Sequence, residues 1–472
     1  MAIGIRLCRR PRLTRWAAGR AGCLLVAALV AVGMLAAPGP ALAATASWPQ
    51  FGYDPQKSGF NPDETVITRD TVGNLNLDYV AFGPANPNGD FMSQSSPVVV
   101  GSVAYVGTVE GLLLALPAEG CGGASCPQLW KAQLSNGAFT TPAVAGGLVF
   151  IASAGSVANG LGTLYAFRAD GCGRQPSCRP VWTASVPNVG SSPTVANGVV
   201  YIVSSDGRLL AFAAGGCGRR PTCAPLWTGN AGSSAEAAPA VANGLVYVTS
   251  ADRLLAFPAG GCGQAVCAPV WASVPVAGAD TGSGVIQNVA PTVSGNTVYF
   301  ASVDFANPDG KTSTVYAFPA AGCGTLNCQP LWIAHPSDFD SIQSTMTVAN
   351  GVLYASAVGF VFAFDANGCG QPVCGFLWLG ILPGTIAGTG ASPSVAGGVV
   401  YYTQNNGQIG GFDAGGCGNV VCSPLFATVT QAFSGFMTTP VIVNGRLYVA
   451  GPSVDTRPTM WVYRPISLPP AP

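Results

Sequence analysis

Short apolar runs alternate with glycine-rich turns from residue 96 to the end of the chain. In the stretch 192–212, two β-branched runs flank Asn197-Gly198, and a third apolar run follows a second turn. Asn-Gly supplies the positive φ angles of a type I′ turn, which is the strongest short signal for a β-hairpin. A Gly-Cys-Gly loop then leads into a fourth run that begins near Trp227. The pattern predicts four short antiparallel strands and no helix.

This four-strand unit occurs eight times. A small residue followed by proline opens each copy, and successive copies lie 45 to 55 residues apart. The openings are Ser96-Pro97, Thr141-Pro142, Ser192-Pro193, Ala238-Pro239, Ala290-Pro291, Ser392-Pro393 and Thr439-Pro440, with Thr345-Met346 in the sixth place. Repeats of this length and strand content are typical of propellers. We therefore predict an all-β chain that forms an eight-bladed β-propeller of four-stranded antiparallel blades.

The last copy lacks an outer strand, because no cysteine loop or further strand follows Tyr463. Residues 75–82 precede the first blade and alternate as a strand does. We expect this N-terminal strand to complete the last blade and to close the ring, which removes an exposed edge. The predicted organisation is a secretory signal peptide (1–43), an N-terminal extension (44–74), the propeller (75–465) and a C-terminal tail (466–472).

The N-terminus predicts export. Six arginines and no acid precede an apolar run from Cys23 to Ala37, and the small residues Ala41 and Ala43 follow it. This is the order of a cleaved secretory signal. The apolar run is shorter than a membrane span, and no later run reaches that length, so we expect no transmembrane segment in the mature chain. We expect a bacterial protein that is secreted to the extracellular space or held in the cell envelope.

Fourteen cysteines follow the signal and fall into seven close pairs. The pairs are Cys121/Cys126, Cys172/Cys178, Cys217/Cys223, Cys262/Cys267, Cys323/Cys328, Cys369/Cys374 and Cys417/Cys422. An even number of closely spaced cysteines in an exported chain predicts local disulfides. Zinc binding is the alternative, but structural zinc sites commonly use tighter C-x-x-C knuckles or histidines, and the chain has one histidine.

One large aromatic residue occupies the same place in each blade. These residues are Trp130, Trp182, Trp227, Trp271, Trp332, Trp378, Phe426 and Tyr79. One interpretation is an aromatic ligand-binding set. Their regular phase favours the other interpretation, in which each ring fills the wedge between neighbouring blades.

Charge excludes one class of partner. Loss of the six signal-peptide arginines leaves 14 basic against 20 acidic residues, a net charge of about −6. An acidic body without a basic cluster argues against nucleic acid as the partner. Charged residues make up 8% of the chain and hydrophobic residues 49%, which is typical of a turn-rich globular protein rather than a disordered one. We expect a monomer.

The repeat resembles that of the pyrroloquinoline-quinone (PQQ) type of β-propeller. The shared features are the small-residue-Pro opening, the hairpin, an Ala-Phe third strand, a glycine loop and a terminal tryptophan. That superfamily includes quinoprotein alcohol dehydrogenases and BamB-type outer-membrane assembly scaffolds. The opening Trp48-Pro49-Gln50-Phe51 also looks like the start of non-catalytic secreted members. The resemblance covers residues 48–465 and implies the fold.

The resemblance does not extend to the residues of a cofactor site. Quinoprotein alcohol dehydrogenases place a disulfide between adjacent cysteines against PQQ, and they use acidic and amide calcium ligands and a catalytic Asp. This chain has no Cys-Cys dipeptide, and Gly-Cys-Gly replaces the turn that the family places before its tryptophan. We therefore predict no cofactor, with PQQ and calcium as the alternative.

The titratable residues form no clear catalytic constellation. His335 is interpreted as a loop residue rather than a general base, because no serine or cysteine nucleophile can be assigned to it. Asp304 and Asp309 give a partial calcium-loop pattern without the distal Glu. Asp338 and Asp340 are either solvated loop acids or a carboxylate pair of the kind that glycoside hydrolases use.

The irregular loops are expected to gather on one face, because loops between the second and third strands lie on the same side as the blade connections. Variable loops on a rigid scaffold are where binding residues concentrate. The candidate binding face is Gln287, Phe305, Asn307, Asp309, Lys311, Asp338, Phe339, Asp340, Phe433 and Phe436. The sequence thus predicts a binding scaffold for a protein or glycan partner. The alternative is a PQQ-dependent oxidoreductase, or another propeller enzyme that uses loop carboxylates.

Overall fold

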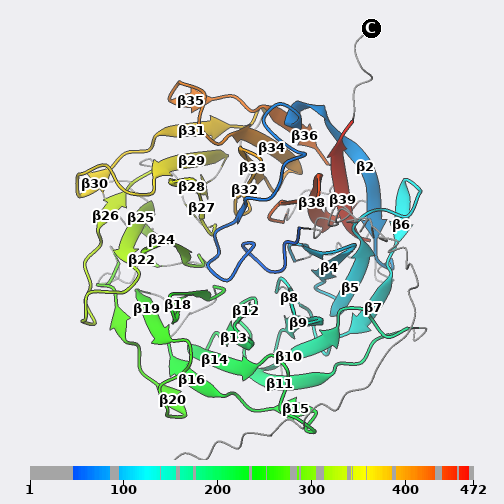
Figure 1. The fold of residues 1–472 in the computed structure, drawn as a ribbon, viewed down its shortest axis with the longest axis vertical. Coiled ribbons are helices and arrows are strands. Elements are labelled where there is room, and N and C mark those ends of the chain that lie inside the picture. The colour runs from blue at the N-terminus through cyan, green and yellow to red at the C-terminus, as the bar shows by residue number, and fades with distance from the viewer. Residues whose placement is uncertain are drawn as a thin grey trace, which may run out of the picture. The chain divides into compact units, whose positions relative to one another are not determined.

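Eight sheets surround a central axis in the computed structural model (Figure 1). The eight-bladed propeller expected from the repeats is confirmed. The structure describes residues 46–85, 95–138, 140–155, 160–173, 177–232, 237–250, 252–276, 284–285, 289–304, 313–336, 342, 344–357, 359–384, 390–430, 438–453 and 457–466. The predicted signal peptide lies outside these residues. Their one helix is the single 3-10 turn η1 (Val72–Asn74), and none of them forms a helix able to cross a membrane.

Each blade is a sheet of four antiparallel strands, which lie side by side in order from the axis to the rim. The innermost strands are β3 (Val98–Val100), β8 (Ala143–Ala145), β12 (Thr194–Ala196), β17 (Ala240–Ala242), β23 (Thr292–Ser294), β27 (Thr347–Ala349), β32 (Ser394–Ala396) and β37 (Val441–Val443). The second strands are β4 (Val103–Gly107), β9 (Leu148–Ser153), β13 (Val199–Val203), β18 (Leu245–Thr249), β24 (Thr297–Asp304), β28 (Val352–Ala357), β33 (Val399–Thr403) and β38 (Arg446–Pro452).

The third strands are β5 (Leu112–Pro117), β10 (Leu161–Arg168), β14 (Arg208–Ala213), β19 (Leu254–Pro258), β25 (Ser313–Pro319), β29 (Phe360–Asp365), β34 (Gln408–Asp413) and β39 (Pro458–Pro465). The outer strands are β7 (Trp130–Gln133), β11 (Trp182–Pro187), β16 (Trp227–Asn230), β21 (Trp271–Ala272), β26 (Trp332–Ala334), β31 (Trp378–Ile381), β36 (Phe426–Val429) and β2 (Leu75–Phe82). Two sheets contain a further short strand: β1 (Phe60–Asn61) is added to blade 7, and β22 (Gly284–Val285) is added to blade 5.

Local turn chemistry and burial explain these strands. Asn197 and Gly198 have φ angles of 49° and 76°, as a type I′ turn requires. The same pair of positive angles recurs at Asn243-Gly244, Asn350-Gly351 and Asn444-Gly445. The middle strands are buried on both faces because each blade packs between two others. Strands such as β5 and β33 are therefore buried throughout instead of alternating.

The N-terminal strand closes the ring as predicted. Strand β2 pairs antiparallel with β39 over its full length, so the last blade combines residues from both ends of the propeller. Figure 1 shows these two strands side by side at the seam. Ring closure thereby leaves no gap between blades 8 and 1.

In seven of the eight blades the aromatic residue of the outer strand packs against the next blade, which confirms the packing interpretation; Phe426 is the exception, because blade 8 has no cysteine loop. The partner of each of the seven rings is the glycine that precedes the first cysteine of the next blade's loop, and these glycines have positive φ angles. The contacts are Gly171 on Trp130, Gly216 on Trp182, Gly261 on Trp227, Gly322 on Trp271, Gly368 on Trp332, Gly416 on Trp378 and Gly120 on Tyr79. No side chain fits there, because the ring lies directly against the glycine.

All seven predicted disulfides form. Each stapled loop lies at the rim and binds the outer strand of the preceding blade. Five loops do so as a parallel fifth strand: β6 (Ser125–Pro127), β15 (Thr222–Cys223), β20 (Val266–Cys267), β30 (Val373–Cys374) and β35 (Val421–Cys422). The other two use a bridge from Cys328 to Ser273 and a hydrogen bond from Cys178 to Lys131. The loops therefore cover edges that would otherwise be exposed.

The two cysteines of a staple differ in burial, which their spacing in the sequence did not indicate. Cys121 is exposed, whereas its disulfide partner Cys126 is fully buried, with 0% of its surface exposed. Cys126 belongs to the apolar cluster that contains Tyr79 and Ala118, because β6 pairs with β2 and holds this cysteine against the seam. The second cysteine of every other pair is buried as well. Each staple thus anchors a rim loop in the core between two blades.

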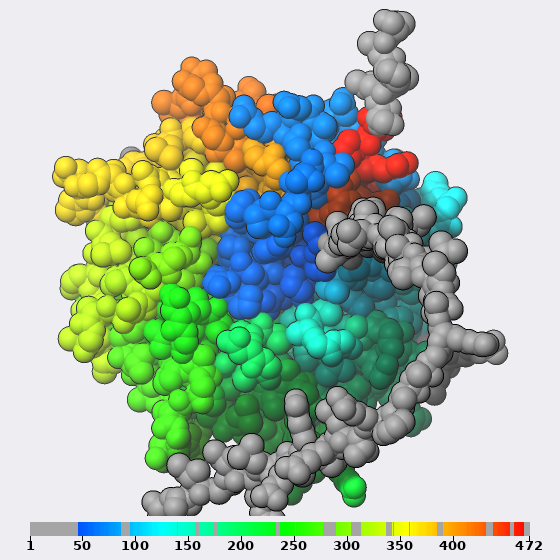
Figure 2. All heavy atoms as spheres, in the orientation of Figure 1, coloured from blue at the N-terminus to red at the C-terminus, as the bar shows by residue number. Residues whose placement is uncertain are grey.

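An N-terminal segment fills the hub. Residues 48–61, which we call the axial segment, wind once around the axis and reach the innermost strands of all eight blades in chain order. The segment is the dark blue trace at the centre of Figure 1, and its atoms cover the centre of the ring in Figure 2. The sequence pattern did not predict this arrangement.

The axial segment bonds to the same position in every blade, two residues after the small-residue-Pro proline or its Met346 counterpart. In six blades the backbone N–H there donates to a segment carbonyl, as Val144 does to Pro49 at 2.7 Å. In blade 3, Val195 N–H donates to the Gln50 side-chain oxygen at 2.9 Å. In blade 8 the direction reverses, and Asn61 Nδ2 donates to the Ile442 carbonyl at 2.8 Å. The segment thus satisfies backbone groups that face the axis.

Lys57 lies in the middle of the axial segment and is fully buried. Its Nζ donates to the Phe51 carbonyl at 3.0 Å and lies 5.8 Å from the centre of the Phe51 ring. Burial lowers the pKa of Lys57 to about 7, and nearby Asp54 only partly offsets the effect. The folded protein therefore releases the Lys57 proton at a much lower pH than an exposed lysine does.

The glycine-on-tryptophan contact is testable with Gly216→Ala. A Cβ at Gly216 would lie 2.6 Å from Trp182 Cδ1, whereas a Cβ at Gly218 meets nothing within 4 Å. Both glycines have φ near +80°. Gly218→Ala should therefore cost about 1 kcal/mol for the left-handed backbone alone, and Gly216→Ala about 3 kcal/mol because overpacking is added. Urea unfolding measures both, and equal losses would show that the contact is not tight.

The pH dependence of stability tests the burial of Lys57. Between pH 7 and about 10.4 the unfolded chain holds a proton on Lys57 that the folded chain has released. Stability contributed by this residue should therefore rise with pH in that range, by up to about 1.4 kcal/mol per unit, and stay constant below pH 7. Urea unfolding of wild type and Lys57→Met at pH 6 to 9 should give curves that converge with pH. Parallel curves would contradict a buried neutral amine.

Candidate functional site

The predicted binding face is not part of the described structure. Gln287, Phe305, Asn307, Asp309, Lys311, Asp338, Phe339, Asp340, Phe433 and Phe436 all lie outside the described residues. Only the backbone of Asp304 is described, at the end of β24. The loop-face prediction therefore stays a prediction.

The predicted disulfide cysteines have a structural role. Cys126 and Cys328 are the most deeply buried of them, with 0% of the surface of each exposed. These two cysteines therefore cannot contribute to a surface site, because the second sulfur of each staple lies inside. The physical reason is that each loop packs against the preceding blade, as Cys126 does beside Tyr79.

His335 is described and half-buried at the end of β26. Its Nδ1 lies 3.2 Å from Thr314 Oγ1 and 3.4 Å from the Ser313 carbonyl oxygen. In the described part of the chain no carboxylate orients the imidazole, and no group of three His, Cys, Asp or Glu side chains is placed to hold a metal ion. The described contacts of His335 are thus those of a side chain that ties two strands together.

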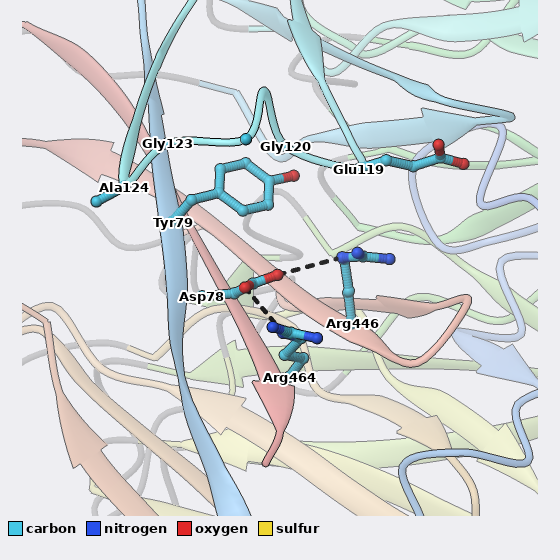
Figure 3. Close-up of a pocket in the computed structure, with 9 residues that line it drawn as sticks. Asp78, Tyr79, Glu119, Gly120, Gly123, Ala124, Arg446 and Arg464 are labelled. Atoms are coloured by element: carbon cyan, nitrogen blue, oxygen red, sulfur yellow. Dashed lines mark hydrogen bonds and ion pairs between the residues drawn. The ribbon is translucent and has the colours of Figure 1, made fainter. Parts of the chain in front are cut away.

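A polar pocket of about 400 Å³ lies at the seam, where β2 completes blade 8. We call it the seam pocket. Its walls are Asp78, Tyr79, Glu119, Arg446, Arg464 and the glycine loop from Gly120 to Ala124 (Figure 3). This is where the repeat changes: Asp78 stands where seven blades have Leu or Val, and Tyr79 stands where six have Trp. Arg446 likewise begins a second strand that is apolar or Thr at this point in the other blades.

Asp78 joins the two arginines of the seam pocket. Its Oδ1 accepts a hydrogen bond from Arg464 Nε at 2.8 Å, and its Oδ2 lies 3.6 Å from Arg446 Nε. Figure 3 shows the carboxylate between the two guanidinium groups. Because Asp78, Arg446 and Arg464 come from β2, β38 and β39, the cluster ties the N-terminal strand to the two strands that precede the C-terminus.

The other groups of the seam pocket are polar and can bind a ligand. Arg446 Nε is buried and has no hydrogen-bond partner among the described residues, while the carboxylate of Glu119 is exposed at the opposite side. Tyr79 donates to the Pro117 carbonyl at 2.9 Å, and burial raises the pKa of its hydroxyl. The two guanidinium groups balance the carboxylates of Asp78 and Glu119, so the seam pocket has no net charge and suits a polar ligand group.

The rim carries a second unusual feature, a row of exposed apolar side chains. Each member precedes the aromatic residue of an outer strand, and each is 40–57% exposed. The members are Leu129, Val181, Leu226, Val270, Leu331, Leu377 and Leu425. Because these exposed apolar side chains recur at one position of the repeat, they form a regular row around the rim.

Blades 5 to 7 extend this row into an apolar surface. Two positions further along the outer strand, blades 1 to 3 have Lys131, Thr183 and Thr228, whereas blades 5 to 7 have Ile333, Leu379 and Ala427. Exposed valines from the cysteine loops pair beside them, Val373 with Ile333 and Val421 with Leu379. We call the following set the apolar sector: Leu331, Ile333, Val373, Leu377, Leu379, Val421, Leu425 and Val429.

Few charges surround the apolar sector. Residues 312–445 contain no Lys, Arg or Glu, and their four charged residues are Asp338, Asp340, Asp365 and Asp413. Asp413 forms an ion pair with Arg69. A partner bound here therefore gains little from charge and must be recognised through apolar contact and backbone hydrogen bonds.

Comparisons with known proteins identify the type of propeller. A family model described as outer membrane protein assembly factor BamB matches residues 217–414, from the cysteine loop of blade 3 to the end of β34 in blade 7. BamB from Moraxella catarrhalis is a similar solved structure, with a TM-score of 0.52 and 14% identity over 83% of this chain and 99% of that one. The chain is a β-propeller, and its residues 217–414 resemble the PQQ-like type.

Two further solved structures share the propeller fold. Quinohemoprotein alcohol dehydrogenase ADHIIG from Pseudomonas putida HK5 has a TM-score of 0.56 and 14% identity, over 90% of this chain and 82% of that one. The computationally designed Ika8 protein has a TM-score of 0.57 and 11% identity, over 81% and 98%. No curated protein sequence matches the chain. At these identities the structural likeness establishes the fold alone.

Sequence reasoning missed both the seam pocket and the apolar sector, although each left a signal. Asp78 and Arg446 depart from the residue type that the other repeats have at the same place, and an alignment of the eight repeats with one another would show them. The apolar sector shows as the long stretch without Lys, Arg or Glu. Neither signal resembles a catalytic motif.

Asp78→Asn tests the role of the seam cluster. The change leaves two neighbouring arginines without their shared carboxylate, and we expect the free energy of unfolding to fall by about 2 kcal/mol. Asp170→Asn is the matched control, because its ion pair with Arg168 is exposed on both sides and should contribute less than about 0.5 kcal/mol. Guanidinium chloride would screen the ion pair, so urea unfolding is the measurement. Similar losses for both variants would contradict a seam-specific role.

Proposed function

We propose that the protein is an exported binding scaffold that holds a protein partner against the apolar sector of its rim. The observation that carries the proposal is the apolar sector itself. Three adjacent blades present exposed Leu and Val side chains beside the half-buried Ile333 and Leu379, in a stretch that has no Lys, Arg or Glu. Large exposed apolar surfaces on soluble proteins mark interaction sites.

Export is supported by the disulfides. Seven local disulfides persist only in an oxidising compartment such as the periplasm or the extracellular space. The basic and apolar N-terminus has the order of a secretory signal. Together they favour a protein that is secreted or kept in the bacterial cell envelope.

A protein partner agrees better with the apolar sector than a glycan or an anionic surface does. Glycan sites need hydrogen-bonding side chains, and anionic surfaces attract Lys and Arg; the apolar sector has neither. Resemblance to a family model described as an assembly factor also favours a protein partner. The seam pocket, which lies at the ring closure, is then a separate polar site.

The described residues do not fit PQQ. All fourteen cysteines beyond the predicted signal pair within loops at the rim, so no sulfur is left for the adjacent-cysteine disulfide that the quinoprotein resemblance implies. Within the described ranges no three acidic, His or Cys side chains gather as a calcium site would need. The donor set thus supports a scaffold without this cofactor.

Variants of the apolar sector test the proposed function. The triple change Leu331→Ser, Leu377→Ser, Leu425→Ser should leave the melting temperature nearly unchanged, since exposed substitutions cost little. It should abolish capture of the partner by the purified, immobilised protein from envelope extracts. The triple change Leu129→Ser, Val181→Ser, Leu226→Ser alters the same repeat position in blades with polar neighbours and should leave capture intact.

The two triple variants separate recognition from general stickiness. Equal loss of capture in both would mean that any exposed leucine of the row contributes, and the apolar sector would not be the binding surface. Undiminished capture in both would contradict the proposed function. Dye binding by 8-anilinonaphthalene sulfonate gives a partner-free check, because it should fall more in the blade 5 to 7 variant.

A further inference from the structure

The outer edge of blade 7 differs from the other seven. Each cysteine loop binds the outer strand of the preceding blade, but blade 8 has no cysteine loop. Strand β36 in blade 7 pairs with β34 on its inner side, and no described residue pairs with its outer side. An open strand edge offers unpaired backbone groups to another chain.

The covered edges show which group of β36 is open. The residue after the outer-strand aromatic donates its N–H to the loop, as Thr183 does to Pro221 at 2.8 Å, Thr228 to Ala265 at 2.9 Å and Leu379 to Val420 at 2.8 Å. The equivalent residue in blade 7 is Ala427. It is exposed, whereas the three donors in the covered edges are half-buried.

A buried hydroxyl next to β36 reflects the same break in the repeat. The second-strand tyrosine of six blades donates to a carbonyl in the following blade, as Tyr354 does to Ala414 at 2.7 Å. Tyr401 of blade 7 is buried, and its hydroxyl has no partner among the described residues. The turn η1 supplies Val72 to the core around Phe426, so the aromatic face is covered while the edge stays open.

We infer that the outer edge of β36 is the docking site for an extended segment of the partner protein, which joins blade 7 as a parallel fifth strand. The inference rests on the proposed function and states how the partner binds. Strand addition to an open edge is a common mode of peptide recognition. Main-chain hydrogen bonds provide affinity, and Leu425 and Val429 flank the edge with exposed apolar side chains.

The protein itself shows what such a segment looks like. Five cysteine loops already pair in this way, parallel and in the same register, and each places a β-branched residue or serine just before its second cysteine. The segment should therefore be short, uncharged and β-branched, because Leu425, Ala427 and Val429 continue the apolar sector. An uncharged segment also matches the scarcity of charge in residues 312–445.

Two other occupants fit less well. The chain's own C-terminal residues 467–472 read Ser-Leu-Pro-Pro-Ala-Pro, and three of the six lack the N–H that a strand must donate. A second copy has no spare cysteine loop to offer, because all seven bind within their own ring. A partner protein is thus the occupant that the contacts favour.

Ala427→Pro tests the edge directly. Proline removes the outward N–H but no bond to β34, and edge strands tolerate it; Ala427→Ser keeps the N–H and is the matched control. The probe is a fluorescent peptide of residues 414–424 closed by the Cys417–Cys422 disulfide, which copies a loop that binds β31. Fluorescence anisotropy should show binding to wild type and Ala427→Ser, and at least tenfold weaker binding to Ala427→Pro.

Hydrogen exchange keeps the test valid if Ala427→Pro unfolds the strand. In the wild-type protein, the amides of residues 427–429 should exchange more slowly once the peptide is added. Exchange that the peptide does not change, or peptide binding that Ala427→Pro leaves intact, would overturn the inference.

A photocrosslinking phenylalanine analogue in place of Val429 identifies what binds the edge of β36 in the cells that express the protein. The expected adduct joins the protein to a different protein and disappears with Ala427→Pro. An adduct to residues 467–472 or to a second copy would overturn the partner assignment. Partner capture that survives Ala427→Pro but is lost with the apolar-sector triple variant would overturn strand addition and leave the proposed function standing.

Discussion

The axial segment is the contact on which the ring depends. Blades of a propeller touch only their neighbours, so nothing in the repeat itself links blade 1 to blade 5. Residues 48–61 provide that link, because this one continuous segment forms a hydrogen bond with the same position of all eight innermost strands. The hub is thereby filled, and its backbone donors are satisfied without solvent. The buried amine of Lys57 lies within this segment, so the packed hub contains a titratable group.

A second, simpler set of contacts organises the rim. Each cysteine loop packs a glycine on the aromatic ring of the preceding blade and covers the edge of its outer strand. A blade therefore holds its predecessor twice, through a ring face and through backbone pairing. Blade 8 lacks a cysteine loop, which leaves the edge of β36 in blade 7 open. The polar seam pocket lies in blade 8 itself, beside β2. The seam pocket and the open edge of β36 thus lie where the repeat is broken, whereas most of the apolar sector lies on regular blades.

Local chemistry made much of the fold predictable. The Asn-Gly turns fix φ angles on their own, the aromatic phase marks the outer strands, and the missing eighth outer strand points to residues 75–82. The axial segment escaped prediction because it makes single bonds to eight different strands and has no strand alternation of its own. The two-residue fifth strands are too short to leave a pattern, so the spacing of Cys121 and Cys126 gave the disulfide but not the burial of Cys126. The seam pocket joins Asp78 to Arg446 and Arg464, which lie far away in sequence, so only the closed ring brings them together.

The most direct test of this account is urea unfolding of a mature chain that lacks residues 46–62, with and without a synthetic peptide of those residues. The account predicts that the shortened protein loses its cooperative transition or unfolds at much lower urea. Added peptide should restore stability in proportion to the logarithm of its concentration, because it binds only the folded ring. A shortened protein that unfolds at the wild-type urea concentration, and that the peptide does not change, would contradict the central role of the axial segment.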